Sequence, residues 1–387
     1  MKLTPPPSLH PASPAPSFPL LIKAPSRQCN LRCTHCFYHP VPPGKALSQR
    51  MSHDTLMQLT RTYLAQPIAQ HTFIWQGGEP CLMGLDFFKT AWRFQKKYTQ
   101  GSIIANCLQT NGTLITPPFA DFLARKNFLV GLSIDGPQAL HDTYRKYGSG
   151  KGSYAAVHKS LRLLQERKVA LNSLTLITST NIGYIKDIFY MLAENALFFQ
   201  QYIPCVECST EGKPLPFSLS GAAWGEALCI LFDTWWNTGQ RVTIRYFEDL
   251  LHTLLTGQAG SCQMGGDCRS YLVVEADGSV YPCDFFVSDA WKLGNIWDNT
   301  WEELLHSDLR HTFSLRKRCL PPACQTCHYL ALCGGDCQKH RMASVKTAPP
   351  QSLLCEGYQI FFAHALPRLQ EAARFLAGRL AQAPKPY

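Results

Sequence analysis

The segment CNLRCTHC, residues 29–36, places three cysteines in the spacing Cys-x3-Cys-x2-Cys. Three thiolates on one short loop can bind three irons of a cubane iron–sulfur cluster, which leaves the fourth iron without a protein ligand. A chelating cofactor requires such an open iron. The alternative is zinc, but structural zinc sites use four ligands, usually in paired Cys-x2-Cys form. The spacing therefore favours a cluster over zinc.

Apolar runs with β propensity begin before this segment and recur as far as residue 203. Between them lie amphipathic segments with helical spacing, which Ser52, Pro118, Ser153 and Asn181 can begin. Strands that alternate with helices at intervals of roughly 30 residues predict βα units and a parallel sheet. Because six units are too few for a closed eightfold barrel, we expect an α/β fold with an open or partial barrel, or a doubly wound sheet. The expected strands are residues 20–22, 72–75, 103–108, 128–134, 171–177 and 198–203, and the expected helices are residues 54–64, 119–126, 154–168, 182–195 and 222–236.

Composition and charge exclude several classes of protein. Of the 387 residues, 45% are hydrophobic, so a disordered chain is excluded. No apolar run approaches the roughly 20 residues of a membrane span, and the N-terminus has no apolar signal sequence. Seventeen cysteines in a chain without an export signal indicate metal binding and a reducing, cytoplasmic location. The net charge of +10 comes from scattered residues, with no basic run longer than residues 316–318, so we expect no nucleic-acid partner.

The sequence divides into four parts. Residues 1–19 contain seven prolines and are expected to form a flexible tail. Residues 20–240 form the strand–helix core, and residues 241–357 form a cysteine-rich domain. Within this domain, Asp277-Gly278 between two short apolar runs predicts a β-hairpin. Residues 358–387 are expected to form a C-terminal helix that is interrupted at Pro367.

The motifs of the core resemble those of the radical S-adenosylmethionine (SAM) superfamily. After the cysteine segment and Phe37-Tyr38 come WQGGEP at residues 75–80, QTNG at 109–112 and LSIDGP at 132–137, each at the end of an expected strand. The resemblance implies a partial (β/α)6 radical SAM barrel. It also implies that a [4Fe-4S] cluster on Cys29, Cys33 and Cys36 binds SAM through its open iron.

The resemblance also implies which residues contact SAM. The Gly-Gly-Glu segment, with Gly78 allowing close approach, would provide acceptors for the methionine ammonium. Ser133 and Arg145 would hold the methionine carboxylate, to which the fork of an arginine is suited. His35 and Val206 would line the pocket. Ser133 and Val206 can equally be ordinary residues at strand ends.

The C-terminal cysteines resemble those of the SPASM domain, the auxiliary-cluster module of peptide-modifying radical SAM enzymes. The resemblance implies two further [4Fe-4S] clusters, each on four cysteines. One would be held by Cys262, Cys268, Cys283 and Cys337, and the other by Cys324, Cys327, Cys333 and Cys355. A zinc ribbon at Cys324 and Cys327 would leave six of these cysteines unexplained. The remaining cysteines are interpreted as small hydrophobic residues, with a minor redox possibility for Cys205 and Cys208.

Within this group the chain is most similar to the anaerobic sulfatase-maturating enzymes. That similarity implies oxidation of a Cys or Ser of a nascent sulfatase to Cα-formylglycine, a post-translational modification. We expect Asp284 to be the base that takes the thiol or hydroxyl proton, with Tyr38 or Glu207 as the next candidates. Alternatively, Asp284 only ends a hairpin strand. The expected partners are the sulfatase segment and an electron carrier such as ferredoxin or flavodoxin, and the chain is expected to be a monomer without a membrane partner.

Two rival functions belong to other classes. A radical SAM maturase that forms a thioether or other crosslink in a small precursor peptide would be favoured by an N-terminal winged-helix domain. The first 19 residues are too few and too rich in proline for one. A non-catalytic metal-binding protein is disfavoured by the intact cysteine loop together with the Gly-Gly-Glu segment.

The cysteine count predicts the iron content. Ligand sets of three, four and four cysteines hold three four-iron clusters, so anaerobically reconstituted protein should contain about 12 irons per chain. Iron and zinc analysis of the same sample checks this number. About four irons together with stoichiometric zinc would contradict the assignment of two auxiliary clusters.

Overall fold

The structure is a computed structural model that describes residues 17–38, 49–209, 211–342 and 349–382. The predicted proline-rich tail lies outside the described residues except for residues 17–19. In the described part, no helix combines the length and the apolar character needed to cross a membrane.

One ten-stranded sheet organises the chain, in the order β10-β9-β8-β1-β2-β3-β4-β5-β6-β7. The six strands expected from the sequence are confirmed as neighbouring parallel strands. The short β7 extends the sheet beyond β6, and β8 pairs in parallel with β1 on the opposite side. The strands are β1 (Leu20–Lys23), β2 (Gln70–Trp75), β3 (Ile103–Thr110), β4 (Leu129–Ser133), β5 (Ala170–Ile177), β6 (Phe199–Pro204), β7 (Thr243–Ile244), β8 (Leu272–Glu275), β9 (Ser279–Tyr281) and β10 (Gly294–Asn295).

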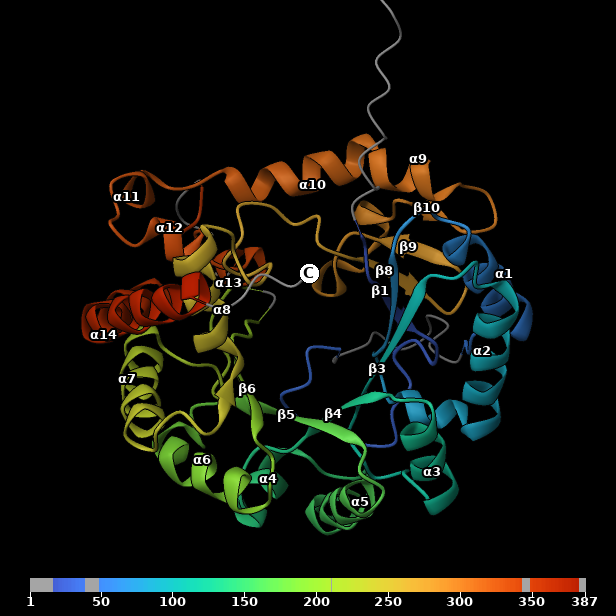
Figure 1. The fold of residues 1–387 in the computed structure, drawn as a ribbon, viewed down its shortest axis with the longest axis horizontal. Coiled ribbons are helices and arrows are strands. Elements are labelled where there is room, and N and C mark those ends of the chain that lie inside the picture. The colour runs from blue at the N-terminus through green and yellow to red at the C-terminus, as the bar shows by residue number, and fades with distance from the viewer. Residues whose placement is uncertain (1–16, 39–48, 210, 343–348, 383–387) are drawn as a thin grey trace, which may run out of the picture.

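Helices cover the outer face of the six-stranded arc, as expected for βα units (Figure 1). The helices of the first part of the chain are α1 (His53–Leu64), α2 (Leu85–Tyr98), α3 (Pro117–Arg125), α4 (Gln138–Tyr144), α5 (Tyr154–Glu166), α6 (Ile185–Glu194), α7 (Gly221–Asn237) and α8 (Arg245–Thr256). Those of the second part are α9 (Trp301–His306), α10 (Asp308–Arg318), α11 (Pro322–Gln325), α12 (Leu330–Cys333), α13 (Gln338–Met342) and α14 (Cys355–Gln382). Short 3-10 turns lie at Pro80–Met83, Ile182–Tyr184, Asp284–Phe286 and Asp289–Trp291.

The C-terminal elements fill the gap between β1 and β6 (Figure 1). The hairpin predicted at Asp277-Gly278 is confirmed, because β8 and β9 pair antiparallel around it. Its strand β8 shares a buried core with β1 and with Trp301 of α9. The C-terminal cysteine domain is therefore built onto the edge of the barrel sheet. The boundary expected near residue 240 falls between α7 and β7.

Helix starts follow the local sequence in part. Ser52 caps α1 as expected, since its hydroxyl accepts a hydrogen bond from the Thr55 amide at 3.0 Å. Ser153 precedes α5, but its hydroxyl instead donates to the Arg145 carbonyl at 2.8 Å. The segment after Asn181 begins with a 3-10 turn and becomes the α-helix α6 only at Ile185. At Ser153 a contact with a residue outside the helix replaces the cap, and at Asn181 the side-chain oxygen instead accepts a hydrogen bond from the Thr178 amide at 2.7 Å.

The expected interruption of the last helix at Pro367 is wrong. Helix α14 runs from Cys355 to Gln382 with Pro367 inside it. Its side chains Phe361 and Leu369 are fully buried in a core with α7 and α8. Proline removes one backbone hydrogen bond, and burial of this apolar face outweighs that loss.

Helices α7 and α14 cross with their backbones in contact. A Cβ added to Gly225 would lie 2.5 Å from the Gly357 carbonyl oxygen and 2.6 Å from its Cα. A Cβ on Gly357 would lie 2.9 Å from the Gly225 nitrogen. The neighbouring atoms belong to backbone, so they cannot move aside. Glycine is therefore required at this crossing.

The crossing predicts opposite effects for two glycine substitutions in α14. Gly357→Ala should lower the free energy of unfolding by about 2 kcal/mol, because the added methyl group overpacks the helix contact. Gly378→Ala is the control, since nothing lies within 4 Å of its added Cβ. It should be neutral or stabilising by up to about 1 kcal/mol, the helix preference of Ala over Gly. Thermal unfolding of the reconstituted proteins measures both, and equal effects would contradict the proposed contact.

Candidate active site

The loop after β1 brings together the first three cysteines. Burial raises the pKa of the Cys29 and Cys33 thiols to about 11, and neighbouring thiols of the same loop add to both increases. The guanidinium of Arg145 opposes the increase at Cys33. The side-chain amide nitrogen of Asn111 lies 3.6 Å from the Cys29 sulfur. A metal group bound here must displace the thiol protons, so its binding depends on pH.

The Gly-Gly-Glu segment after β2 fixes this loop. The Glu79 amide donates to the Gln28 carbonyl at 2.8 Å, directly before Cys29. Gly78 has φ +54°, and a Cβ there would lie 2.9 Å from the Gln28 nitrogen. The close approach that requires glycine is therefore an approach of protein backbone to the cysteine loop.

Glu79 is buried, and three hydrogen bonds engage its carboxylate. The Cys81 amide and the Thr110 hydroxyl donate to Oε1 at 2.9 and 2.7 Å, and the Asn111 amide donates to Oε2 at 2.7 Å. The carboxylate thus joins the ends of β2 and β3. The expected contact of Glu79 with a methionine ammonium stays a prediction. The carboxylate would have to accept that contact in addition to its three hydrogen bonds within the protein.

Arg145 pairs with Asp135 at the end of β4. Its Nε and Nη2 donate to the two carboxylate oxygens at 2.5 and 3.1 Å, and His35 Nε2 lies 3.3 Å from Oδ2. Burial alone would raise the pKa of Asp135, but the charges of Arg145 and His35 hold it well below its usual range. Ser133 ends β4 and the buried Val206 follows β6, so both lie at the carboxyl ends of the strands. The expected contact of Arg145 and Ser133 with a carboxylate ligand stays a prediction.

Asp284 lies in a buried polar network. The Tyr38 hydroxyl donates to Oδ2 at 2.7 Å, and the Gln76 amide donates to the same oxygen at 3.2 Å. The ammonium of Lys23 lies 3.3 Å from Oδ1 and 2.8 Å from Oε1 of Glu275. One ammonium thus faces two carboxylates. Asp284 is only 6% exposed, which does not fit a simple surface turn.

The sequence did not indicate Lys23, Gln76 or Glu275 as members of the site. A charged residue at the end of the buried strand β1 was the available signal for Lys23, whose side chain has no exposed surface. Gly77 makes room for its stem, because a Cβ there would lie 2.7 Å from Lys23 Cγ. Burial and the charge of Asp284 raise the pKa of Tyr38 well above its usual value, so Tyr38 is a hydrogen-bond donor here.

Four of the C-terminal cysteines surround one cavity, lined among others by Cys262, Cys268, Cys283 and Cys337. The Tyr271 oxygen lies 3.4 Å from the Cys283 sulfur, and the Gln338 amide donates to the Cys268 sulfur at 3.3 Å. Burial raises the pKa of Cys337 to about 12, with a further increase from Asp336 and from Cys262. The donor set and the enclosed space fit a cluster held by four thiolates.

The other four cysteines gather around α11, α12 and the start of α14. Burial raises the pKa of Cys324, and Cys355 and Cys327 raise it further. Burial also raises the pKa of Cys333 to about 12, with added contributions from Asp336, Cys355 and Cys324. These four thiols therefore lie close to one another and form a third set. All 17 cysteines are described, and none is in a disulfide.

The cysteines outside the three sets have packing roles or lie apart. Cys81 and Cys205 are buried, and the Cys205 backbone is hydrogen-bonded to Ile177 and Leu219.

Glu207, the other candidate base, forms an ion pair with Lys339, whose ammonium also lies over the Phe285 ring at 4.5 Å. Among the described residues, no three His, Cys, Asp or Glu side chains are arranged to hold a single metal ion.

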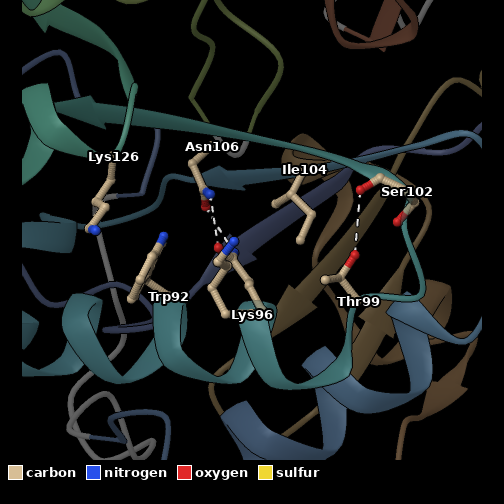
Figure 2. Close-up of a pocket in the computed structure, with 8 residues that line it drawn as sticks. Trp92, Lys96, Thr99, Ser102, Ile104, Asn106 and Lys126 are labelled. Carbon is tan, nitrogen blue, oxygen red and sulfur yellow. Dashed lines mark hydrogen bonds between the residues drawn. The ribbon is translucent and has the colours of Figure 1, made fainter.

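A hollow between α2 and β3 lies away from these sets (Figure 2). Asn106 and Gln95 satisfy each other through two amide hydrogen bonds of 2.9 and 3.0 Å. The ammonium of Lys126 lies 3.6 Å from the centre of the Trp92 ring. Asn106, Gln95 and Lys126 in this hollow are thus engaged with protein groups.

Comparisons with known proteins agree with this arrangement. Residues 24–191 match the radical SAM superfamily, and residues 265–328 match the SPASM family, described as an iron-sulfur cluster-binding domain. The chain is 38% identical over 365 residues to the cysteine-type anaerobic sulfatase-maturating enzyme of Clostridium perfringens (strain ATCC 13124), covering 92% of this chain and 99% of that enzyme. It is 34% identical to the serine-type enzyme of Bacteroides thetaiotaomicron, covering 94% and 93%.

A solved structure is similar over the same range. It is described as native anSMEcpe with bound AdoMet and Cp18Cys peptide, and it matches with a TM-score of 0.87 and 38% identity. The match covers 93% of this chain and 99% of that chain. These findings confirm the predicted α/β fold with a radical SAM barrel and a SPASM domain.

The three separate cysteine sets predict separable loss of iron. Joint replacement of Cys29, Cys33 and Cys36 by Ala should remove about four irons of about 12 and leave the other two sets loaded. Cys229→Ala in α7 is the control and should keep all the iron, because Cys229 lies in none of the sets. Iron analysis and Mössbauer spectra of the reconstituted variants check both. Loss of all iron in the triple variant would show that the sets do not load independently.

Proposed function

The chain belongs to the anaerobic sulfatase-maturating enzymes of the radical SAM superfamily, and we propose that it oxidises a cysteine or serine of a sulfatase polypeptide to Cα-formylglycine. The observation that carries the proposal is the placement of Asp284. Its buried carboxylate lies next to Cys283 in the chain and is bonded to Tyr38 from the cysteine loop and Gln76 from the Gly-Gly-Glu segment. A proton acceptor therefore lies between the two halves of the site.

Three [4Fe-4S] clusters and SAM are the cofactors of this proposal. Cys29, Cys33 and Cys36 would hold the cluster that binds SAM, with His35, Gly78, Ser133, Arg145 and Val206 around SAM. Cys262, Cys268, Cys283 and Cys337 would hold the second cluster, and Cys324, Cys327, Cys333 and Cys355 the third. When bound, these groups supply the radical that removes a hydrogen atom from Cβ of the target and take up the electron that the target then loses.

Asp284 takes the remaining proton. Loss of a hydrogen atom, a proton and an electron converts serine to the aldehyde, and converts cysteine to a thioaldehyde that water hydrolyses with release of hydrogen sulfide. The proton moves from the target oxygen or sulfur to Oδ2, where Tyr38 and Gln76 hold the carboxylate in place. The ammonium of Lys23 faces two carboxylates, those of Glu275 and Asp284, so this group of three side chains carries one excess negative charge. The proton that Asp284 receives neutralises that charge.

The two other candidate bases are less suited to this role. The raised pKa of Tyr38 keeps its hydroxyl protonated, so it cannot accept a proton. Glu207 is held in an ion pair with Lys339. Asp284 thus remains the acceptor that the geometry favours.

The setting of the reaction follows from its chemistry. The substrate is an unfolded or nascent segment of the sulfatase, because the target must reach a buried carboxylate. An electron carrier such as ferredoxin or flavodoxin delivers and removes single electrons. We place the enzyme in the reducing cytoplasm as a monomer, because the proposal requires eleven cysteines to serve as thiolate ligands rather than to form disulfides.

The role of Asp284 predicts an uncoupled reaction. Asp284→Asn keeps the side-chain size and removes the proton acceptor, so SAM cleavage should continue while formylglycine falls by roughly 100-fold. Asp289→Asn, at an exposed position five residues later, is the control and should give normal product.

Anaerobic incubation with Cys and Ser forms of a sulfatase-derived peptide, followed by mass spectrometry, measures 5′-deoxyadenosine and formylglycine in one reaction. Equal product from Asp284→Asn and the unmodified enzyme would remove Asp284 from the mechanism. No formylglycine from either peptide with the unmodified, fully loaded enzyme would overturn the proposed function.

A further inference from the structure

Lys317 in α10 is a buried cation whose ammonium is hydrogen-bonded to three backbone carbonyl oxygens. Lys317 is only 1% exposed. The ammonium donates to the carbonyl oxygens of Gln263 and Asp336 at 2.7 and 2.6 Å, and to that of Cys262 at 3.3 Å. In the described part of the chain, Lys317 forms no ion pair with a carboxylate. A buried ammonium without an anion is strongly disfavoured.

The anions that fit this cation are the thiolates of the neighbouring cavity. Lys317 lines the same cavity as Cys262, Cys268, Cys283 and Cys337. One of its three acceptors is the backbone carbonyl of Cys262 itself. The cation is therefore part of the wall of the proposed cluster site.

A buried charge of the opposite sign lies close by in the chain. Asp336 precedes Cys337 and follows Cys333, so it stands between the two C-terminal cysteine sets. Its carboxylate accepts hydrogen bonds from His340 at 2.9 Å and Ser352 at 2.5 Å. Asp336 also has φ +62°, a conformation unusual for a residue other than glycine. The polar network therefore maintains a fixed negative charge at a strained position.

We infer that Lys317 is the counter-charge of the cluster held by Cys262, Cys268, Cys283 and Cys337 and raises its reduction potential. Reduction adds one negative charge to the cluster, and a fixed cation in a buried wall stabilises the added charge. The cluster beside Asp284 thereby becomes the better acceptor for the electron that the substrate loses. The inference rests on the proposed cysteine ligands and does not depend on which substrate is oxidised.

Redox titration of the auxiliary clusters tests this role. The protein also carries the Cys29, Cys33 and Cys36 replacements by Ala, so that only the two C-terminal clusters contribute, and EPR follows their reduction. Lys317→Gln keeps donors for the carbonyl oxygens but removes the charge. One of the two midpoint potentials should shift to a lower value, and the other should stay unchanged. Lys317→Arg, which keeps the charge, should retain the original potential.

Two further variants serve as controls of position and sign. Arg318→Gln removes one positive charge from the next residue of α10, whose side chain is 59% exposed, and should shift neither potential. Asp336→Asn removes the buried negative charge, and asparagine tolerates a positive φ. The Asp336→Asn substitution should therefore raise the midpoint potential of at least one of the two auxiliary clusters, whereas Lys317→Gln lowers one.

The outcomes separate this inference from the proposed function. Unchanged potentials in Lys317→Gln with full iron would overturn the inference alone. Loss of about four irons in Lys317→Gln but not in Lys317→Arg would support it, because the charge is then needed to hold the cluster. Loss of iron in both would overturn it and assign Lys317 a structural role. Absence of auxiliary iron from the unmodified enzyme would overturn the proposed cysteine ligands themselves.

Discussion

The parallel pairing of β1 with β8 is the constraint on which the rest of the structure depends. It sets Lys23 opposite Glu275 in the register, although more than half of the chain separates them. Lys23 has no exposed surface, so its charge must be neutralised from within the protein. Among the described residues, the carboxylates that do so are those of Glu275 in β8 and of Asp284 in the 3-10 turn after β9. The barrel and the cysteine domain are thereby joined at the site of the proposed chemistry.

The sequence motifs of the site also hold its architecture together. Glu79 joins the ends of β2 and β3, and the Gly-Gly backbone supports the cysteine loop. Arg145 holds Asp135, whose carboxylate also accepts a hydrogen bond from the Leu176 amide on β5. A substitution in these motifs would therefore disturb the position of the thiols as well as any contact with SAM. Loss of activity alone does not distinguish the two effects.

Buried cations accompany the sulfur sites. Arg145 lies close enough to Cys33 to lower its pKa, Lys317 lines the cavity of Cys262, Cys268, Cys283 and Cys337, and Lys23 forms ion pairs with Glu275 and Asp284. Each is taken out of water and placed against anions or carbonyl oxygens. Burial of these cations does not account for the net charge of +10, because buried carboxylates accompany them.

The sequence by itself predicted the strand–helix alternation and the hairpin at Asp277-Gly278, because periodicity and turn residues are local properties. The grouping of the C-terminal cysteines was implied by the resemblance to the SPASM domain. The sequence also placed the polar motifs at strand ends. The tertiary structure alone decided that Lys23 and Gln76 meet Asp284, that Arg145 pairs with Asp135, and that α14 continues through Pro367. These features depend on burial and on charges that meet from distant parts of the chain. A local sequence pattern does not predict which buried charged side chains will pair with each other.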